Sequence, residues 1–160
     1  MKRLLTLGTV VVLILISYGL LTAQSNPALG TWKLNVAKSK YVGTPAPKSN
    51  TTTITAQGDG VKVSVEGVAG DGSRIAYSYM TNLDGKDSAI SGVGAPGGED
   101  TIAVKRVDAN TTTSTAKKAG KVTATTRTVI SKDGKVRTVT AKGTDDQGKP
   151  LSVAAVYDKQ

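Results

Sequence analysis

Several kinds of residue are missing or scarce in this chain of 160 residues. It has no cysteine, no histidine and no phenylalanine, and aromatic residues make up 4% of the sequence. The absence of cysteine excludes disulfides and a lipobox acylation site, so packing and hydrogen bonds must hold the fold. Without histidine or cysteine, nucleophile–histidine arrangements and the usual zinc sites are excluded. We therefore expect a protein that is not an enzyme, with no catalytic residue, no metal site and no cofactor.

Acidic residues are outnumbered by basic ones. Lysine and arginine total 21 against 12 aspartates and glutamates, giving a formal net charge of +9, to which Lys2 and Arg3 contribute two charges. A basic surface attracts anionic polymers or lipid head groups weakly. Nucleic-acid sites usually pair basic stripes with exposed aromatics, and this chain has one tryptophan and five tyrosines. We expect no nucleic-acid partner, and contact with an anionic surface stays open as an alternative.

A long uncharged apolar run occurs at the N-terminus. Met1-Lys2-Arg3 precedes the run from Leu4 to Ile16, and small residues follow at Ala23-Gln24-Ser25. This order is typical of a secretory signal peptide cleaved before Asn26, or else after Ala23. The pattern predicts a signal over residues 1–25 and a single exported domain, periplasmic or secreted, over residues 26–160. The alternative is an uncleaved membrane anchor, because Leu4 to Ala23 is about long enough to span a bilayer.

The rest of the chain alternates tight turns with short β-prone stretches. Asp59-Gly60, Asp71-Gly72 and Asp133-Gly134 are among the turns, and Asp-Gly between runs rich in valine and threonine is a strong hairpin signal. About ten strands follow from this spacing. They are expected near residues 29–34, 51–57, 61–67, 73–81, 86–90, 101–107, 111–117, 121–131, 135–143 and 150–158. The fold class predicted is an all-β antiparallel meander.

The alternation of side chains indicates what such a meander encloses. Val61, Val63 and Val65 share one face, opposite Lys62 and Ser64. A meander leaves unpaired edges unless it closes into an up-and-down barrel, although two packed sheets stay an alternative. A barrel of 8 to 10 strands lined by small side chains does not fill itself. We therefore expect an internal cavity, part apolar and part lined by hydroxyls.

The order of these features resembles the calycins, the lipocalins and fatty-acid-binding proteins. Gly30-Thr31-Trp32 lies on the first expected strand, and the last strand carries Val156-Tyr157-Asp158-Lys159. The resemblance implies that Gly30 and Trp32 form the barrel base and that the protein carries a small hydrophobic or amphipathic molecule as a monomer. Fatty-acid-binding proteins place an arginine two residues before the last-strand tyrosine, where this chain has Ala155. Arg127 and Arg137, on the two preceding strands, are the alternatives for that role.

Four residues are the candidates for ligand contact. Tyr77, Tyr79 and Tyr157 each offer an apolar ring and a hydroxyl, or else simply fill the barrel. Arg106 shares a face with Ile102 and Val104, where an inward guanidinium needs an anion, unless it lies in water at the strand end. The barrel mouth is expected at the end formed by the segment 35–50, the Asp71 turn, the glycine-rich loop 92–100 and the turns at 117–121 and 145–149. That loop is a candidate gate.

Overall fold

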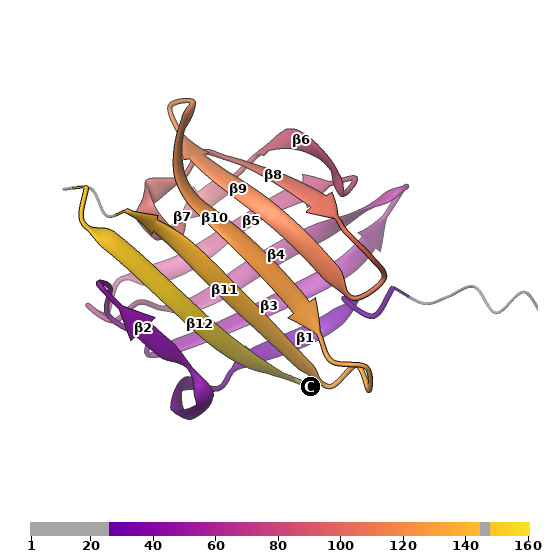
Figure 1. Cartoon of the computed structure of the whole chain (residues 1–160), viewed down its shortest axis with the longest axis horizontal. Coiled ribbons are helices and arrows are strands. Elements are labelled where there is room, and N and C mark those ends of the chain that lie inside the picture. Colours follow the sequence, from indigo (N-terminus) through magenta and orange to yellow (C-terminus); the bar gives the residue numbers. More distant parts are fainter. Residues whose placement is uncertain (1–25, 145–147) are drawn as a thin grey trace, which may run out of the picture.

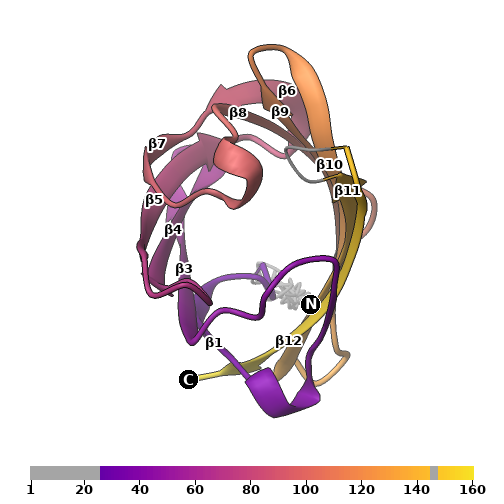
Figure 2. The same cartoon turned by 90° about the vertical axis from the view of Figure 1, so that its left-hand side faces the viewer.

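The chain folds as a nearly closed antiparallel β-barrel in a computed structural model that describes residues 26–144 and 148–160 (Figures 1 and 2). The all-β barrel predicted from the sequence is confirmed. The expected signal segment lies outside the described residues. Within the described part, no helix has the length and apolar character needed to cross a membrane.

Twelve strands and two short 3-10 helices make up the described chain. The strands are β1 (Gly30–Leu34), β2 (Lys40–Val42), β3 (Ser49–Gln57), β4 (Gly60–Val68), β5 (Arg74–Thr81), β6 (Asp84–Ala89), β7 (Ser91–Val93), β8 (Thr101–Arg106), β9 (Thr111–Lys118), β10 (Lys121–Ile130), β11 (Val136–Thr144) and β12 (Pro150–Lys159). The helices are η1 (Val36–Lys38) and η2 (Pro96–Gly98). The count exceeds the ten expected because two strands were not predicted: β2 lies in the segment 35–50, and β7 follows the strand expected near residues 86–90.

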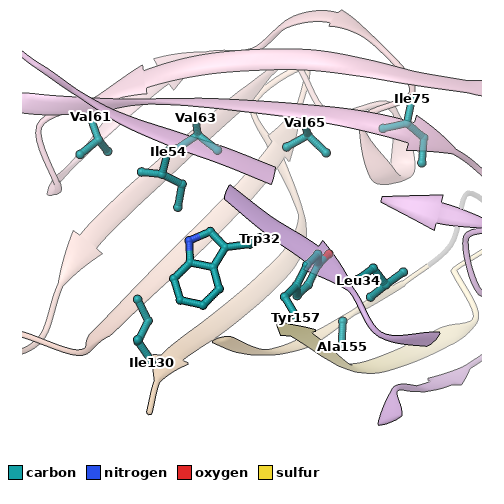
Figure 3. Close-up of a cluster of buried hydrophobic side chains, with 10 residues drawn as sticks. All are labelled: Trp32, Leu34, Ile54, Val61, Val63, Val65, Ile75, Ile130, Ala155 and Tyr157. Carbon is teal, nitrogen blue, oxygen red and sulfur yellow. The ribbon is translucent and has the colours of Figure 1, made fainter. Parts of the chain in front are cut away.

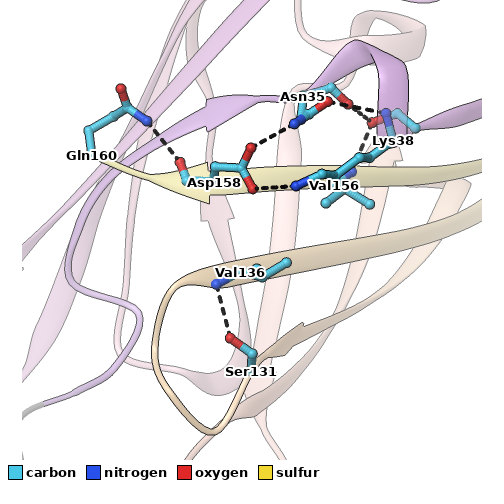
Figure 4. A network of polar contacts seen from close by, with 8 residues as sticks. Asn35, Lys38, Ser131, Val136, Val156, Asp158 and Gln160 are labelled. Atoms are coloured by element: carbon cyan, nitrogen blue, oxygen red, sulfur yellow. Dashed lines mark hydrogen bonds and ion pairs between the residues drawn. The ribbon is translucent and has the colours of Figure 1, made fainter.

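The first additional strand is β2, which follows β1 after the short helix η1. Asn35 caps η1 by accepting a hydrogen bond from Lys38 N at 3.2 Å, and its Nδ2 donates to Asp158 on β12 at 2.7 Å (Figure 4). Lys38 adds an ion pair with Asp158 at 3.4 Å. The chain leaves the sheet at η1 and returns to it as β2. β2 pairs with β12 and lies outside the main strand order. Between β1 and β3, all of which the structure describes, η1 is the only helix.

The second additional strand, β7, closes the barrel. β6 pairs with β8, whereas β7, one residue further along, pairs with β5 at the opposite edge of the sheet. One short segment therefore joins both ends of the strand order. Gly92 makes this possible, because its φ is +118° and a Cβ there would lie 2.2 Å from the carbonyl oxygen of Ala76. Only glycine allows the two backbones to approach this closely.

Among the described residues, Trp32 is the largest side chain that is completely buried. The Trp32 side chain is 0% exposed and contributes to a cluster that includes Ile54, Ile130 and Tyr157 (Figure 3). Its indole nitrogen donates to Ala28 O at 2.8 Å, and the Lys159 ammonium lies 5.0 Å from the ring centroid. The ring thus has a polar partner, a nearby cation and apolar neighbours. That Gly30 and Trp32 form the barrel base stays a prediction.

Candidate functional site

The barrel encloses a cavity of about 390 Å³. Strands β3, β4 and β5 lie across the barrel from β10 (Figure 2). The side chains that β3, β4 and β5 contribute to the cavity include an apolar set, and those of β9 and β10 carry hydroxyls. The apolar set, or apolar wall, contains Ile54, Val61, Val63, Val65 and Ile75, and the hydroxyl set contains Thr112, Ser114, Thr126 and Thr128. The predicted cavity, part apolar and part hydroxyl-lined, is confirmed. Its volume falls in the range of small-molecule sites in proteins.

A single guanidinium is the main charged group deep in this cavity. Arg137 lies on β11 directly opposite Tyr157 on β12, and its guanidinium carbon is 5.1 Å from the Tyr157 ring centroid. The Nη1 atom is buried and has no hydrogen-bond partner among the described residues. Arg137 also forms no ion pair within the described chain. A buried cationic donor without a partner is costly, so this position favours an anionic or hydrogen-bond-accepting group brought in by a ligand.

Four tyrosines surround the same space. Tyr41, Tyr77, Tyr79 and Tyr157 all line the cavity. Burial raises the pKa of Tyr41 to about 12, with a smaller contribution from Tyr157. Burial also raises the pKa of Tyr77, Tyr79 and Tyr157, and for all three the Arg137 charge opposes the effect. At neutral pH all four phenols are therefore neutral and can donate a hydrogen bond to a ligand.

The residues proposed from the sequence as ligand contacts all line the cavity, at different depths. Tyr77, Tyr79 and Tyr157 lie near Arg137, whereas Arg106 reaches the cavity from the base end and its side chain is exposed. Their role in ligand contact stays a prediction. Of the two arginines considered as substitutes for the missing last-strand arginine, Arg137 points inward and Arg127 is exposed on the outer face.

The described parts of the loops expected at the mouth lie at one end of the barrel, which faces the viewer in Figure 2, and residues 145–147 lie outside the described residues. Gly70 packs against Ala46 and Pro45, and Gly43 packs against Pro150. The glycine-rich loop lines the opening with Gly94 to Gly97, and it is fastened by a hydrogen bond from Ala119 N to Asp100 at 2.7 Å. Thr123 Oγ1 also donates to Glu99 at 3.2 Å. Gating by this loop stays a hypothesis.

Tyr41 was not singled out from the sequence, and Arg137 was named only as one of two alternatives for the missing last-strand arginine. Tyr41 lies on β2, a strand of three residues that is too short for its alternation to reveal a direction. Arg137 shares a face with Val139, which was the only available signal, because threonines occupy much of β10 and β11 and blur the polarity pattern. The unpaired guanidinium atom could be found only from the fold.

Comparisons with known proteins agree with the barrel geometry. No family model matches the chain, and no curated protein does. Among solved structures, the crystal structure of zebrafish ileal bile acid-binding protein complexed with cholic acid is similar, with a TM-score of 0.50 and 15% sequence identity. The match covers 84% of this chain and 99% of the zebrafish chain. At this level of identity the likeness concerns the fold alone, and it agrees with the antiparallel β-barrel described above.

Proposed function

We propose that this protein binds a small amphipathic molecule non-covalently inside the barrel and is a carrier rather than an enzyme. The observation that carries the proposal is the buried, unpartnered Nη1 of Arg137 facing a cavity of about 390 Å³. A ligand with an acidic head group gives this atom a charge-assisted hydrogen bond, while its apolar body lies against the valine and isoleucine wall. The zebrafish protein of the same fold is complexed with cholic acid, which supports a ligand of amphipathic character.

Export belongs to the same proposal. The N-terminal residues 1–25 have the composition of a cleavable signal, and the domain that follows contains no cysteine. A carrier working outside the cytoplasm would give a poorly soluble ligand a dry compartment during transit. Mass measurement of the mature protein from its native host tests this part, because cleavage before Asn26 or after Ala23 predicts distinct masses, whereas an anchored chain keeps residues 1–25.

Displacement of a fluorescent apolar dye tests ligand binding. Purified protein covering residues 26–160 is titrated with laurate and with dodecanol, which share a chain length and differ in charge. We expect laurate to bind more tightly, and Arg137→Met to weaken laurate binding about 10- to 100-fold, as for loss of a charge-assisted hydrogen bond. Dodecanol binding should change little, because the apolar wall is untouched.

The unfolding free energy of the same variant separates ligand binding from a structural role. Removing an unpaired buried charge should leave the empty protein equally or more stable, since methionine retains an apolar stem of similar length. Arg127→Met, which removes the same charge from the outer face, is the matched control and should retain the laurate preference. Retention of that preference by Arg137→Met would refute the proposed anchor, and failure of the wild-type barrel to bind either compound would refute the carrier function.

A further inference from the structure

The outer surface of β9, β10 and β11 carries an unusual combination of side chains. In Figure 1 these strands lie side by side in the wall nearer the viewer. We define the threonine face as seven of their outward residues, Thr113, Thr115, Thr125, Arg127, Thr138, Thr140 and Lys142, and the exposed Val129 lies at its edge, opposite Thr138. The face contains five hydroxyls, two cations, no carboxylate and no aromatic ring. The cavity described above lies on the other side of the same sheet, so this surface is separate from the proposed ligand site.

Sheet register arranges these residues in rows. Arg127 is directly opposite Thr113 on one side and Thr140 on the other. In the next row, Thr125 is opposite Thr115 and Lys142. Arg127 and Lys142 are diagonal neighbours, which places their Cα atoms roughly 7–8 Å apart. A shallow hollow lies between the rows, lined by Arg127, Lys142 and the surrounding threonines.

The segment from β9 to β11 is basic when its turns are included, although its Arg137 points into the cavity. Between Thr111 and Thr144 the sequence has eight basic residues and one acidic residue, Asp133, so this segment carries +7 of the net +9. Asp133 lies in the turn between β10 and β11, where it accepts hydrogen bonds from Ser131 and Lys135. Lys117, at the rim, is paired with Asp87 at 2.7 Å. Within the described chain, Arg127 and Lys142 form no ion pair.

We propose that the threonine face binds an acidic polysaccharide. Arg127 and Lys142 would pair with carboxylate or sulfate groups, and the threonine rows would exchange hydrogen bonds with sugar hydroxyls along an extended chain. Nucleic acid fits less well because the face has no aromatic ring on which a base can stack. A membrane surface fits less well because the centre of the face has no apolar side chain to insert.

Retention on immobilised dextran sulfate tests the proposal, with neutral dextran as the blank. We expect wild-type protein to bind dextran sulfate in a salt-sensitive way and not to bind dextran. The double variant Arg127→Gln/Lys142→Gln should lose about tenfold in affinity, as for two exposed ion pairs. The matched control Lys33→Gln/Lys62→Gln removes the same charge from exposed positions on β1 and β4 and should keep near wild-type affinity.

Several results would overturn this inference. Equal losses in the two double variants would show diffuse attraction to net charge, with no defined face. Tighter binding to single-stranded oligothymidine or to phosphatidylglycerol vesicles than to dextran sulfate at matched salt would assign the face to another partner. Dye displacement by laurate should be unchanged in Arg127→Gln/Lys142→Gln. An unchanged result would establish that the variant is folded. It would also separate a failure of this inference from a failure of the proposed ligand binding in the cavity.

Discussion

At the scale of single residues, Trp32 shows how one side chain can fix the end of a barrel. It is the largest side chain that is completely buried in the described chain, and it combines an indole hydrogen bond with a stacked ammonium group. Because the core contains few other large side chains, its neighbours are mainly valine and isoleucine, which cannot expand to fill the space of a lost ring.

Replacing Trp32 should therefore destabilise the protein strongly. Trp32→Phe removes the hydrogen bond to Ala28 O and weakens the contact with Lys159, at a cost of about 1–2 kcal/mol. Trp32→Ala adds a cavity and should cost about 3–5 kcal/mol, a large part of the stability of an ordinary domain. Urea unfolding measures both values. Met80→Ala is the control and should change stability little, because Met80 is 58% exposed; a comparable loss there would contradict this account.

The sequence predicts single residues well where their neighbours are distinctive. Trp32 is recognisable from Gly30-Thr31-Trp32 at the start of a strand, and the inward direction of Val61, Val63 and Val65 follows from strict alternation. Arg137 is harder, because threonine is compatible with either face of a strand and leaves the direction of β11 open. The burial of its Nη1 depends on packing from β12 and the distant tyrosines of β5, which no local pattern encodes.

At the scale of elements, turns are easier to predict than strand partners. The Asp-Gly reversals place most strand ends within a few residues of those observed, because the turn geometry is set by adjacent residues. The division into β6 and β7 was not predicted, because it depends on each half having a different partner. β8, the partner of β6, and β5, the partner of β7, lie near opposite ends of the strand order. Only closure of the whole sheet brings both partners next to the segment that contains β6 and β7.

Gly92 provides a test of that closure. Gly92→Ala should destabilise the protein by about 1–3 kcal/mol, because alanine is strained at φ +118° and its Cβ meets the Ala76 carbonyl. Gly120→Ala is the matched control: its φ is +77°, but nothing lies within 4 Å of the added carbon. The difference between the two variants isolates the contact between β5 and β7.

Amide hydrogen exchange measures which strands are destabilised by Gly92→Ala. Gly92→Ala should speed exchange in β5 and β7 before it affects β11 and β12, since the latter pairing is remote from the change. Equal destabilisation by both glycine substitutions would mean that the close approach to β5 contributes nothing beyond backbone strain.

At the scale of the whole molecule, the barrel keeps its tyrosines away from water. Burial raises the pKa of the four tyrosines of the described chain, so the folded state holds them neutral above the ordinary value of 10.0. Groups whose pKa is raised on folding stabilise the fold fully below their unfolded pKa. This contribution is lost as the pH rises from about 10 through the folded values.

Alkaline titration of the protein covering residues 26–160 tests these raised tyrosine pKa values. Tyrosinate absorbance should show little ionisation near pH 10, with Tyr41 titrating near 12 if the barrel is still folded. Ionisation of the other three should coincide with loss of the β-sheet circular dichroism signal, because unfolding exposes them. In urea all four should titrate together near 10. Early, reversible ionisation of several tyrosines in the folded protein would show that the interior is open to water.

The loops at the open end of the barrel bear on how long a ligand stays. A molecule leaving through this end passes the glycine-rich loop and the proline-containing segment 44–47, and the described residues contain no α-helix that would have to unfold before departure. Residence time is then governed by the contacts that hold the ligand inside, above all the interaction with Arg137. Differences in affinity among ligands should accordingly appear mainly in dissociation rates, with association rates that vary little from one compound to the next.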